Sequence, residues 1–151
     1  MLNDGDKAPD FTIPTAEGEF SLNASAGPVV VFFFPRADTS GCTKEAIAFS
    51  ELKAEFDAAG VRVIGISKDT VTKQGKFRAK YDLAFPLGAD DEVDVCEQFG
   101  VWVEKSMYGK KYMGIQRATF LIGSDGSIIK SWPKVKVPGH ADAVLEAVKA
   151  L

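Results

Sequence analysis

The run Val29–Phe34 constrains the fold of this chain more than any other segment, because it reads Val-Val-Val-Phe-Phe-Phe without a polar residue. A strand with one face in water alternates apolar and polar residues, whereas a continuous β-branched and aromatic run indicates a strand buried on both faces. The run is also far shorter than the roughly 20 residues that span a bilayer. The sequence therefore predicts a layered α/β protein in which other elements cover both faces of this strand.

The rest of the chain alternates between helical and strand patterns. Apolar residues at steps of three and four over residues 43–59, followed by Gly60, predict an amphipathic helix with a glycine stop. The other predicted elements are a short hairpin and extended cover within the first 28 residues, a buried strand over 61–67, a polar helix over 70–81, a short edge strand over 85–87, a short helix over 91–99, strands over 117–123 and 127–132 joined as a hairpin at Asp125-Gly126, and a final helix over 140–151.

This order of elements predicts a mixed central β-sheet flanked by helices, with an N-terminal β-hairpin. The first strand–helix–strand unit gives a parallel pair, and the late hairpin adds antiparallel strands. That is the order of a thioredoxin-like fold. At 151 residues, of which 46% are hydrophobic, we expect one α/β domain over residues 1–151.

Composition and charge exclude several classes of function. The net charge is −3, so no basic excess favours nucleic acid or an anionic membrane. The polar, acidic start lacks the apolar stretch of a signal peptide, so we expect a cytoplasmic protein with reduced thiols, in which the sequon Asn23-Ala24-Ser25 carries no meaning. Two cysteines are too few for a disulfide framework or a zinc site, and we expect no metal and no cofactor.

Cys42 lies where chemistry is expected in such a fold, beyond the carboxyl end of a buried parallel strand. Pro35 ends the strand because it cannot donate a ladder hydrogen bond. Thr39 or Ser40 is a good N-cap for the next helix, which puts Cys42 in the first helical turn. The helix dipole and the free N–H groups of that turn favour a thiolate. The alternative is a small buried thiol with a structural role only.

These residues also carry a resemblance to a known family. The pattern Pro35-x-x-x-Thr39-x-x-Cys42 resembles the peroxidatic signature of peroxiredoxins, and its extension through Gly41, Thr43 and Glu45-Ala46 resembles the Q type, also called bacterioferritin comigratory protein. Ser40 stands where that type usually has proline, and we expect a more flexible loop there. The resemblance continues through the blocks at residues 5–11, 63–69, 85–87, 99–102 and 114–122.

The resemblance implies a thiol-dependent peroxidase that reduces hydrogen peroxide and organic hydroperoxides. Cys42 would attack the O–O bond and become a sulfenic acid. A lowered thiol pKa alone does not make a fast peroxidase, because nucleophilicity falls with basicity. By analogy, the Thr39 hydroxyl would accept from and donate to the peroxide and thiolate. The backbone N–H groups of Gly41 and Cys42 would point at the peroxide oxygens, and Arg117 would supply planar donors and a positive charge.

Two further residues complete the implied site. Pro35 would shield the thiolate from water, and Glu45, three residues after Cys42 on the same helical side, would orient Arg117 or the loop. Each of these polar residues has a simpler alternative. Thr39 is a helix cap in any case, Arg117 alone would be a solvated charge at a strand start, and Glu45 could be a first-turn acid matched to the helix dipole.

The second cysteine does not occupy a usual position for a resolving thiol. In the Q type those positions correspond to Ile47 and Arg78 here. Val93, Cys96 and Phe99 share a helical face, so we expect Cys96 to be a buried bystander, with a resolving role as the alternative. The resemblance therefore implies a one-cysteine cycle in which thioredoxin, glutaredoxin or a small thiol reduces the enzyme, and it implies a monomer.

Two other functions compete with the peroxidase. A thiol–disulfide oxidoreductase of the same fold usually needs Cys-x-x-Cys, and Thr39 and Glu45 stand at the partner positions. A non-catalytic thioredoxin-fold binding module would have no reason to keep the Cys42 motif and Arg117 together. A Cys–His protease pair has only His140 as a candidate, and we expect that residue on the surface at a helix start. We expect the basic segment of Lys105, Lys110 and Lys111 to be a solvated loop, with a docking patch for a reductant as the alternative.

Overall fold

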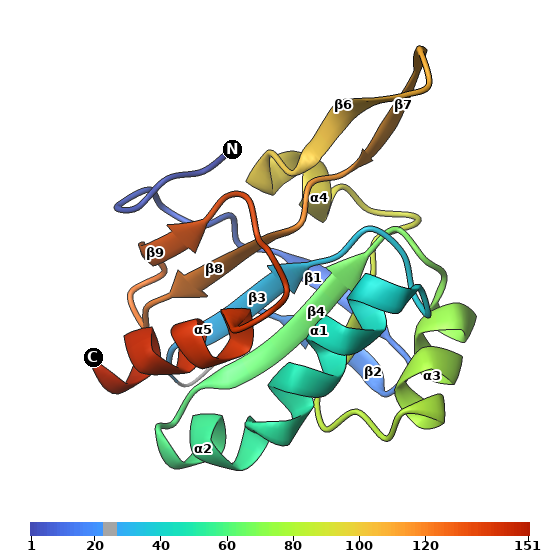
Figure 1. Cartoon of the computed structure of the whole chain (residues 1–151). Helices are drawn as coiled ribbons and strands as arrows, with labels where there is room; N and C mark the ends of the chain where they lie inside the picture. Colours follow the sequence, from blue (N-terminus) through green and yellow to red (C-terminus); the bar gives the residue numbers. More distant parts are fainter. Residues whose placement is uncertain (23–26) are drawn as a thin grey trace.

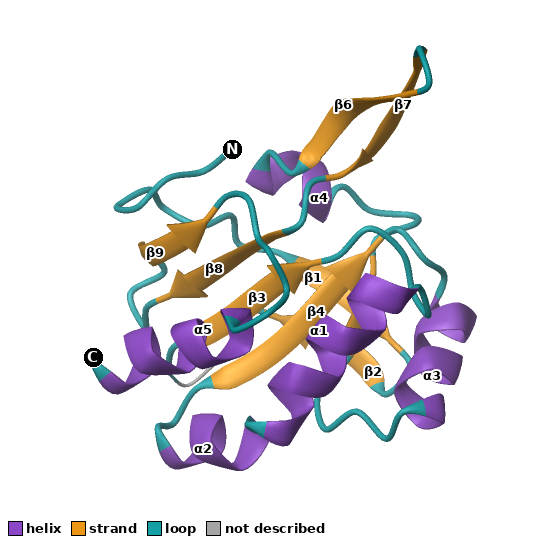
Figure 2. Cartoon of the chain, in the orientation of Figure 1, coloured by secondary structure: helices purple, strands orange, loops and turns teal. Residues whose placement is uncertain are grey.

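The computed structural model describes residues 1–22 and 27–151, so the sequon at Asn23 lies outside the described residues. In that part of the chain, no helix has the length and apolar character needed to cross a membrane. The elements, drawn in Figures 1 and 2, are β1 (Thr12–Thr15), β2 (Gly18–Ser21), β3 (Val29–Phe33), α1 (Ser40–Glu51), α2 (Lys53–Ala58), β4 (Arg62–Ser67), α3 (Val71–Lys80), β5 (Leu87–Ala89), α4 (Val95–Phe99), β6 (Trp102–Met107), β7 (Lys110–Ile115), β8 (Ala118–Ile122), β9 (Ile128–Trp132) and α5 (His140–Lys149).

The central sheet is mixed, as predicted, with the strand order β5-β4-β3-β8-β9. β3 lies in the middle, paired in parallel with β4 and antiparallel with β8. The predicted hairpin of the last two strands is also present, because β8 pairs antiparallel with β9. β1 and β2 form the separate N-terminal hairpin that the sequence predicted.

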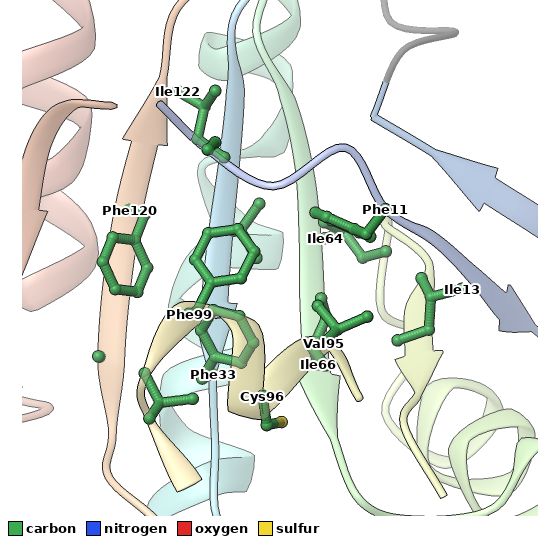
Figure 3. Close-up of a cluster of buried hydrophobic side chains, with 14 of the residues drawn as sticks. Phe11, Ile13, Phe33, Ile64, Ile66, Val95, Cys96, Phe99, Phe120 and Ile122 are labelled. Carbon is green, nitrogen blue, oxygen red and sulfur yellow. The ribbon is translucent and has the colours of Figure 1, made fainter. Parts of the chain in front are cut away.

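The side chains of β3 alternate between two hydrophobic clusters, one on each face of the sheet. Val29, Val31 and Phe33 belong to the first cluster, which α4 and β1 cover, and Figure 3 shows Phe33 packed beneath Phe99 of α4. The intervening residues belong to the second cluster, which also contains side chains of α1, α2, α3 and α5. In Figure 1, α1 and α5 lie in front of the sheet. Burial on both faces explains why the run contains no polar residue.

Three predicted elements have different boundaries in the structure. The helix expected over 43–59 is two helices that meet at Leu52, where the backbone N–H bonds to the carbonyl of Phe49. The edge strand is β5, two residues later than expected, because Pro86 cannot donate to the ladder. The helix expected over 91–99 begins only at Val95, where the buried Asp90 carboxylate accepts the N–H groups of Val95 and Cys96.

Lys110 and Lys111 are exposed, as expected, but the expectation that Lys105, Lys110 and Lys111 lie in a loop is wrong. These residues lie in β6 and β7, a two-stranded hairpin that projects from the body of the molecule (Figure 1). Its turn has positive φ angles at Tyr108 (51°) and Gly109 (77°), as a tight hairpin turn with a right-handed twist requires. The Lys105 amine folds back to the Ile115 carbonyl and is half-buried. Apolar and polar residues alternate only weakly over residues 102–115, and the segment is rich in lysine, so the sequence did not indicate strands there.

Candidate active site

The loop between β3 and α1 sets Cys42 at the start of a helix, beyond the carboxyl end of β3. Thr39 is the N-cap residue, and Cys42 is the third residue of α1. Only 1% of Cys42 is exposed. The Thr39 side chain makes no capping bond, because its hydroxyl donates to the Arg36 carbonyl at 2.8 Å instead. Thr39 is therefore the N-cap residue, as predicted. Its hydroxyl, however, forms a hydrogen bond within the loop and does not cap the helix.

Arg117 lies close to Cys42 because of the register in which β3 and β8 are paired. Phe33 at the end of β3 pairs with Ala118 at the start of β8, so the residue before β8 lies beside the start of α1. Its Nη2 donates to the Cys42 sulfur at 3.3 Å. A Cβ atom on Gly41 would lie 3.3 Å from the same nitrogen, so glycine at this position leaves room for the guanidinium. Arg117 is thus a site residue and not a solvated charge.

Glu45 forms the other side of this arrangement. Its Oε1 accepts from Arg117 Nη1 at 2.7 Å, and its Oε2 is buried with no hydrogen-bond partner among the described residues. Burial raises the pKa of Glu45 to about 7, although the charge of Arg117 acts in the opposite direction. The first turn of α1 holds no acidic residue, so the alternative of a first-turn acid for Glu45 is wrong. Burial acts to lower the pKa of Arg117, but Glu45 and Cys42 outweigh it and raise that pKa.

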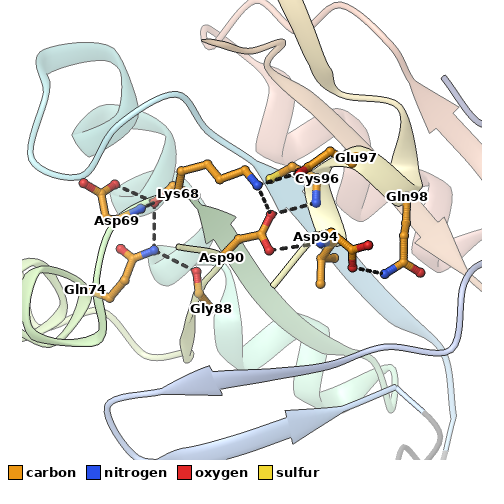
Figure 4. Close-up of polar contacts among 11 residues, drawn as sticks. Lys68, Asp69, Gln74, Gly88, Asp90, Asp94, Cys96, Glu97 and Gln98 are labelled. Carbon is orange, nitrogen blue, oxygen red and sulfur yellow. Dashed lines mark hydrogen bonds and ion pairs between the residues drawn. The ribbon is translucent and has the colours of Figure 1, made fainter. Parts of the chain in front are cut away.

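A chain of buried polar groups holds the loop from the side of β4. The N–H of Ala37 donates to Asp69 Oδ2 at 2.7 Å, and the Ser67 hydroxyl donates to the same oxygen. Gln74 donates to the Ser67 hydroxyl and to the Gly88 carbonyl, both at 2.8 Å (Figure 4). The stretch Ser67-x-Asp69, which formed part of the resemblance, therefore anchors the loop that precedes Cys42.

A second anchor holds the same loop from α3. Asp38 has a positive φ of 60°, a conformation that most residues avoid. Its carboxylate accepts from Lys80 at 2.9 Å and from the Tyr81 hydroxyl at 2.7 Å. These contacts tie the loop to the C-terminal end of α3. The sequence offered no signal for either anchor, since both join residues more than 30 positions apart.

An open pocket of about 400 Å³ adjoins the loop on the side of the β6–β7 hairpin. Lys105 lines it, and burial together with the positive charge of Arg117 lowers the pKa of Lys105, while the charge of Cys42 acts to raise it. Sequence reasoning missed this residue because it placed Lys105 in a solvated loop. The pocket is lined by Pro35, Arg36, Lys68, Asp69, Trp102, Lys105, Tyr112, Met113, Gly114 and Ile115.

Cys96 lies on the other face of the sheet from Cys42, because the two residues belong to the two different hydrophobic clusters. Figure 3 shows Cys96 in the first of these clusters. Both thiols are free. Burial, and then the negative charge of Asp90, raise the pKa of the Cys96 thiol, so it stays protonated. Figure 4 shows Asp90 between Lys68 and the start of α4. Core packing of Cys96 and Phe99 is confirmed, whereas Val93 is exposed and precedes the helix.

The expectation that His140 lies on the surface is wrong. It is the first residue of α5 and is buried, with Nε2 2.8 Å from the Thr119 hydroxyl and with Phe49 and Trp132 against its ring. Burial, and then the charge of Arg117, lower the pKa of His140 to about 4. A signal was present in the sequence: position 140 lies one turn before Val144, on the apolar stripe of the helix.

Comparison with known proteins identifies the family. Residues 5–131 match the AhpC/TSA family. Peroxiredoxin Bcp from Escherichia coli is 44% identical over 150 residues, which are 98% of this chain and 96% of that protein. Peroxiredoxin Q from Xanthomonas campestris has a similar structure, with a TM-score of 0.88 and 44% identity over 93% of this chain and 90% of that one.

A third relative bears on the reaction. The bacterioferritin comigratory protein of Xanthomonas campestris was solved in a study of its alkyl peroxide reduction activity, and it matches with a TM-score of 0.89 and 41% identity over 96% of this chain and 98% of that one. These neighbours confirm the predicted thioredoxin-like fold. The chain therefore belongs to the AhpC/TSA family, and within it to the Q-type (Bcp) peroxiredoxins, which are thiol-dependent peroxidases.

Proposed function

We propose that Cys42 is the peroxidatic cysteine and that the enzyme reduces hydrogen peroxide and organic hydroperoxides. The Cys42 thiolate attacks one oxygen of the O–O bond, which breaks as the S–O bond forms. The other oxygen leaves with its substituent and takes up a proton, giving water or an alcohol, and Cys42 becomes a sulfenic acid. The observation that carries the proposal is the 3.3 Å contact between Arg117 Nη2 and the Cys42 sulfur.

The groups around the sulfur are suited to the charge that develops during this step. The N–H groups of Gly41 and Cys42 belong to the first helical turn, where they have no intrahelical acceptor. They can donate to the peroxide, as Arg117 can to the oxygen that leaves. The one hydrogen of the Thr39 hydroxyl bonds to the Arg36 carbonyl, so the expected donation to the thiolate is not present in the structure, whereas the hydroxyl oxygen can still accept from a peroxide O–H.

Two residues act through these groups. Glu45 is a positioning residue, because its bond to Nη1 fixes the guanidinium plane while Nη2 meets the sulfur. Pro35 is half-buried between β3 and the loop and has no N–H to attract water, which supports its shielding role. Fixed donors of this kind need no reorganisation during the reaction, so they can stabilise the charge that develops in the transition state.

We also propose a one-cysteine cycle. The Cys42 sulfenic acid would wait for an external thiol of the thioredoxin, glutaredoxin or small-thiol class, because Cys96 is protonated and lies beyond the sheet. A disulfide needs Cα atoms within about 7 Å, which would require the local structure to open. We further propose a monomer, as the resemblance to the Q type implies, and one domain over residues 1–151, because both hydrophobic clusters pack on the single central sheet.

The test is oxidation of Cys42 by stoichiometric peroxide. Cys42→Ser is expected to abolish peroxide consumption in a thiol-coupled assay and to leave the circular dichroism spectrum unchanged. Cys96→Ser is the matched control, with the same substitution at the other buried cysteine, and it should retain activity. Retention of more than about a tenth of the activity in Cys42→Ser would contradict the assignment, because a true nucleophile has no substitute.

A further inference from the structure

A second pocket, of about 430 Å³, adjoins the loop before Cys42 on the side of α3. One wall is the face of α3 that presents residues 73, 76, 77 and 80, whose spacing of three and four puts them on one side of the helix. The other wall is the loop itself. The pocket is lined by Arg36, Ala37, Asp38, Asp69, Lys73, Lys76, Phe77 and Lys80.

The lining of this pocket is strongly positive for a chain whose net charge is −3. It has four cations against two carboxylates. Of the carboxylates, Asp38 pairs with Lys80, and Asp69 accepts two hydrogen bonds. Within residues 1–22 and 27–151, neither Arg36, Lys73 nor Lys76 forms an ion pair. Three exposed cations without partners around one concavity favour an anionic ligand.

The pocket also touches the groups that cover Cys42. Ala37 of its wall packs against the hydrophobic cluster that contains Cys42, and Phe77 of its wall is a member of that cluster. Because Cys42 is only 1% exposed, an external thiol reaches its sulfur only when neighbouring groups move. A ligand in this pocket would directly contact Ala37 and Asp38 of the loop that leads to Cys42.

We propose that this pocket binds the external reductant and that the reductant is a low-molecular-weight thiol carrying carboxylate groups. The proposal rests on the proposed one-cysteine cycle. The volume lies in the range of small-molecule sites, and a protein reductant would need a broad surface rather than a concavity. The carboxylates of the reductant would pair with Lys73, Lys76 and Arg36, and its thiol would remain free to react with the Cys42 sulfenic acid.

The chemistry of this reduction balances with two molecules of the small thiol. The thiolate of the ligand attacks the sulfur of the Cys42 sulfenic acid, so an S–S bond forms and the S–O bond breaks. The departing hydroxide takes up a proton and becomes water. A second thiol then attacks the mixed disulfide at the sulfur of the first ligand, which releases the Cys42 thiolate and a small disulfide.

The experiment measures reduction of preformed Cys42 sulfenic acid by three small thiols, namely mercaptopropionate (anionic), mercaptoethanol (neutral) and cysteamine (cationic). The test variant is Lys73→Gln/Lys76→Gln. The control is Lys110→Gln/Lys130→Gln, which removes the same charge from exposed lysines outside the pocket. Each comparison uses one thiol with different proteins, so intrinsic differences in thiol reactivity cancel.

In the test variant we expect the rate with mercaptopropionate to fall by about fivefold to tenfold, as for the loss of two exposed ion pairs. The rate with mercaptoethanol should stay within about twofold, and the difference between the thiols should shrink at high salt. Control rates should match the wild type. Peroxide oxidation of Cys42 should be equal in all three proteins.

Three results would overturn the inference. One is a loss of rate that is equal for all three thiols. Another is a loss with thioredoxin but not with mercaptopropionate, which would assign the pocket to an acidic protein. The third is a loss confined to the oxidation of Cys42 by a carboxylated hydroperoxide. Failure of Cys42 to oxidise in any of the proteins would instead refute the proposed function.

Discussion

Replacement of Glu45 by glutamine is expected to make the protein more stable at neutral pH and to leave its stability in acid unchanged. The carboxyl group of Glu45 is buried, one of its oxygens has no partner among the described residues, and its pKa is raised from 4.5 to about 7. The folded protein therefore holds a proton that the unfolded chain releases. Glutamine is a neutral side chain of the same shape, so it resembles the protonated acid at every pH.

The sign and size follow from proton linkage. Between pH 4.5 and 7 the folded state binds more protons at residue 45 than the unfolded state, so the free energy of unfolding of the wild type falls as pH rises. The stabilisation is fully present below pH 4.5 and is lost as pH rises through 7. At about 1.4 kcal/mol per pKa unit, the wild type should lose about 3 kcal/mol relative to Glu45→Gln.

The assay is urea unfolding of both proteins under reducing conditions from pH 4 to 8. His140, whose pKa is lowered to about 4, contributes the opposite trend, with stability lost as pH falls from 6.5 to 4. That contribution is common to both proteins and cancels in their difference. Glu51→Gln is the matched control, since Glu51 lies exposed at the end of the same helix. A difference between wild type and Glu45→Gln that does not vary with pH would refute the reasoning.

The remaining predictions concern the site and its neighbours. Arg117→Ala should lower the second-order rate with peroxide by about 10²-fold, as for the loss of one donor to developing charge, and stopped-flow measurements showing an unchanged rate would remove it from the site. One equivalent of peroxide should add about 16 Da to the wild type by sulfenic acid formation, and a loss of about 2 Da that disappears in Cys96→Ser would reveal a disulfide instead. The ring signals of His140, the single histidine, should stay constant from pH 8 to 5.5 in NMR spectra, and a midpoint near 6.5 would show that its ring is hydrated.

Local signals were enough to predict the part of the site that lies on one continuous segment. An apolar run, a proline, a threonine at the N-cap position and a cysteine follow one another over residues 29–42, and the structure contains each in its expected place, although the threonine side chain makes no capping bond. Arg117 was different, since 75 residues separate it from Cys42. The resemblance implied that it belongs to the site, and the pairing of Phe33 with Ala118 explains how it arrives there.

The groups that hold the site could not be predicted, because each depends on a contact between distant segments. Asp69 supports the loop only because β4 runs parallel to β3, and Asp38 meets Lys80 only because α3 packs beside the start of α1. His140 was misjudged from its place after Pro138-Gly139 at a helix start, although its position on the apolar stripe of α5 could be read from the sequence. Charge similarly concealed the strands around Lys105. For polar residues of this kind, the sequence pattern alone did not predict the local environment, and the structure was needed to find it.

The alternation of β3 explains why two buried cysteines of one small protein differ in chemistry. Neighbouring residues of this strand face opposite sides of the sheet, so the cluster around Cys42 and the cluster around Cys96 are separated by the sheet itself. On the first side, a helix begins and Arg117 arrives at the carboxyl end of the strand, which provides donors and positive charge. On the other side, Asp90 uses its carboxylate to start α4 and thereby places negative charge beside Cys96. Exposure does not distinguish the two thiols, since both are almost fully buried; the sign of the nearest charge does. The same Asp90 carboxylate thus accepts the first N–H groups of α4 and disfavours a Cys96 thiolate, which agrees with the proposed resolution by an external thiol.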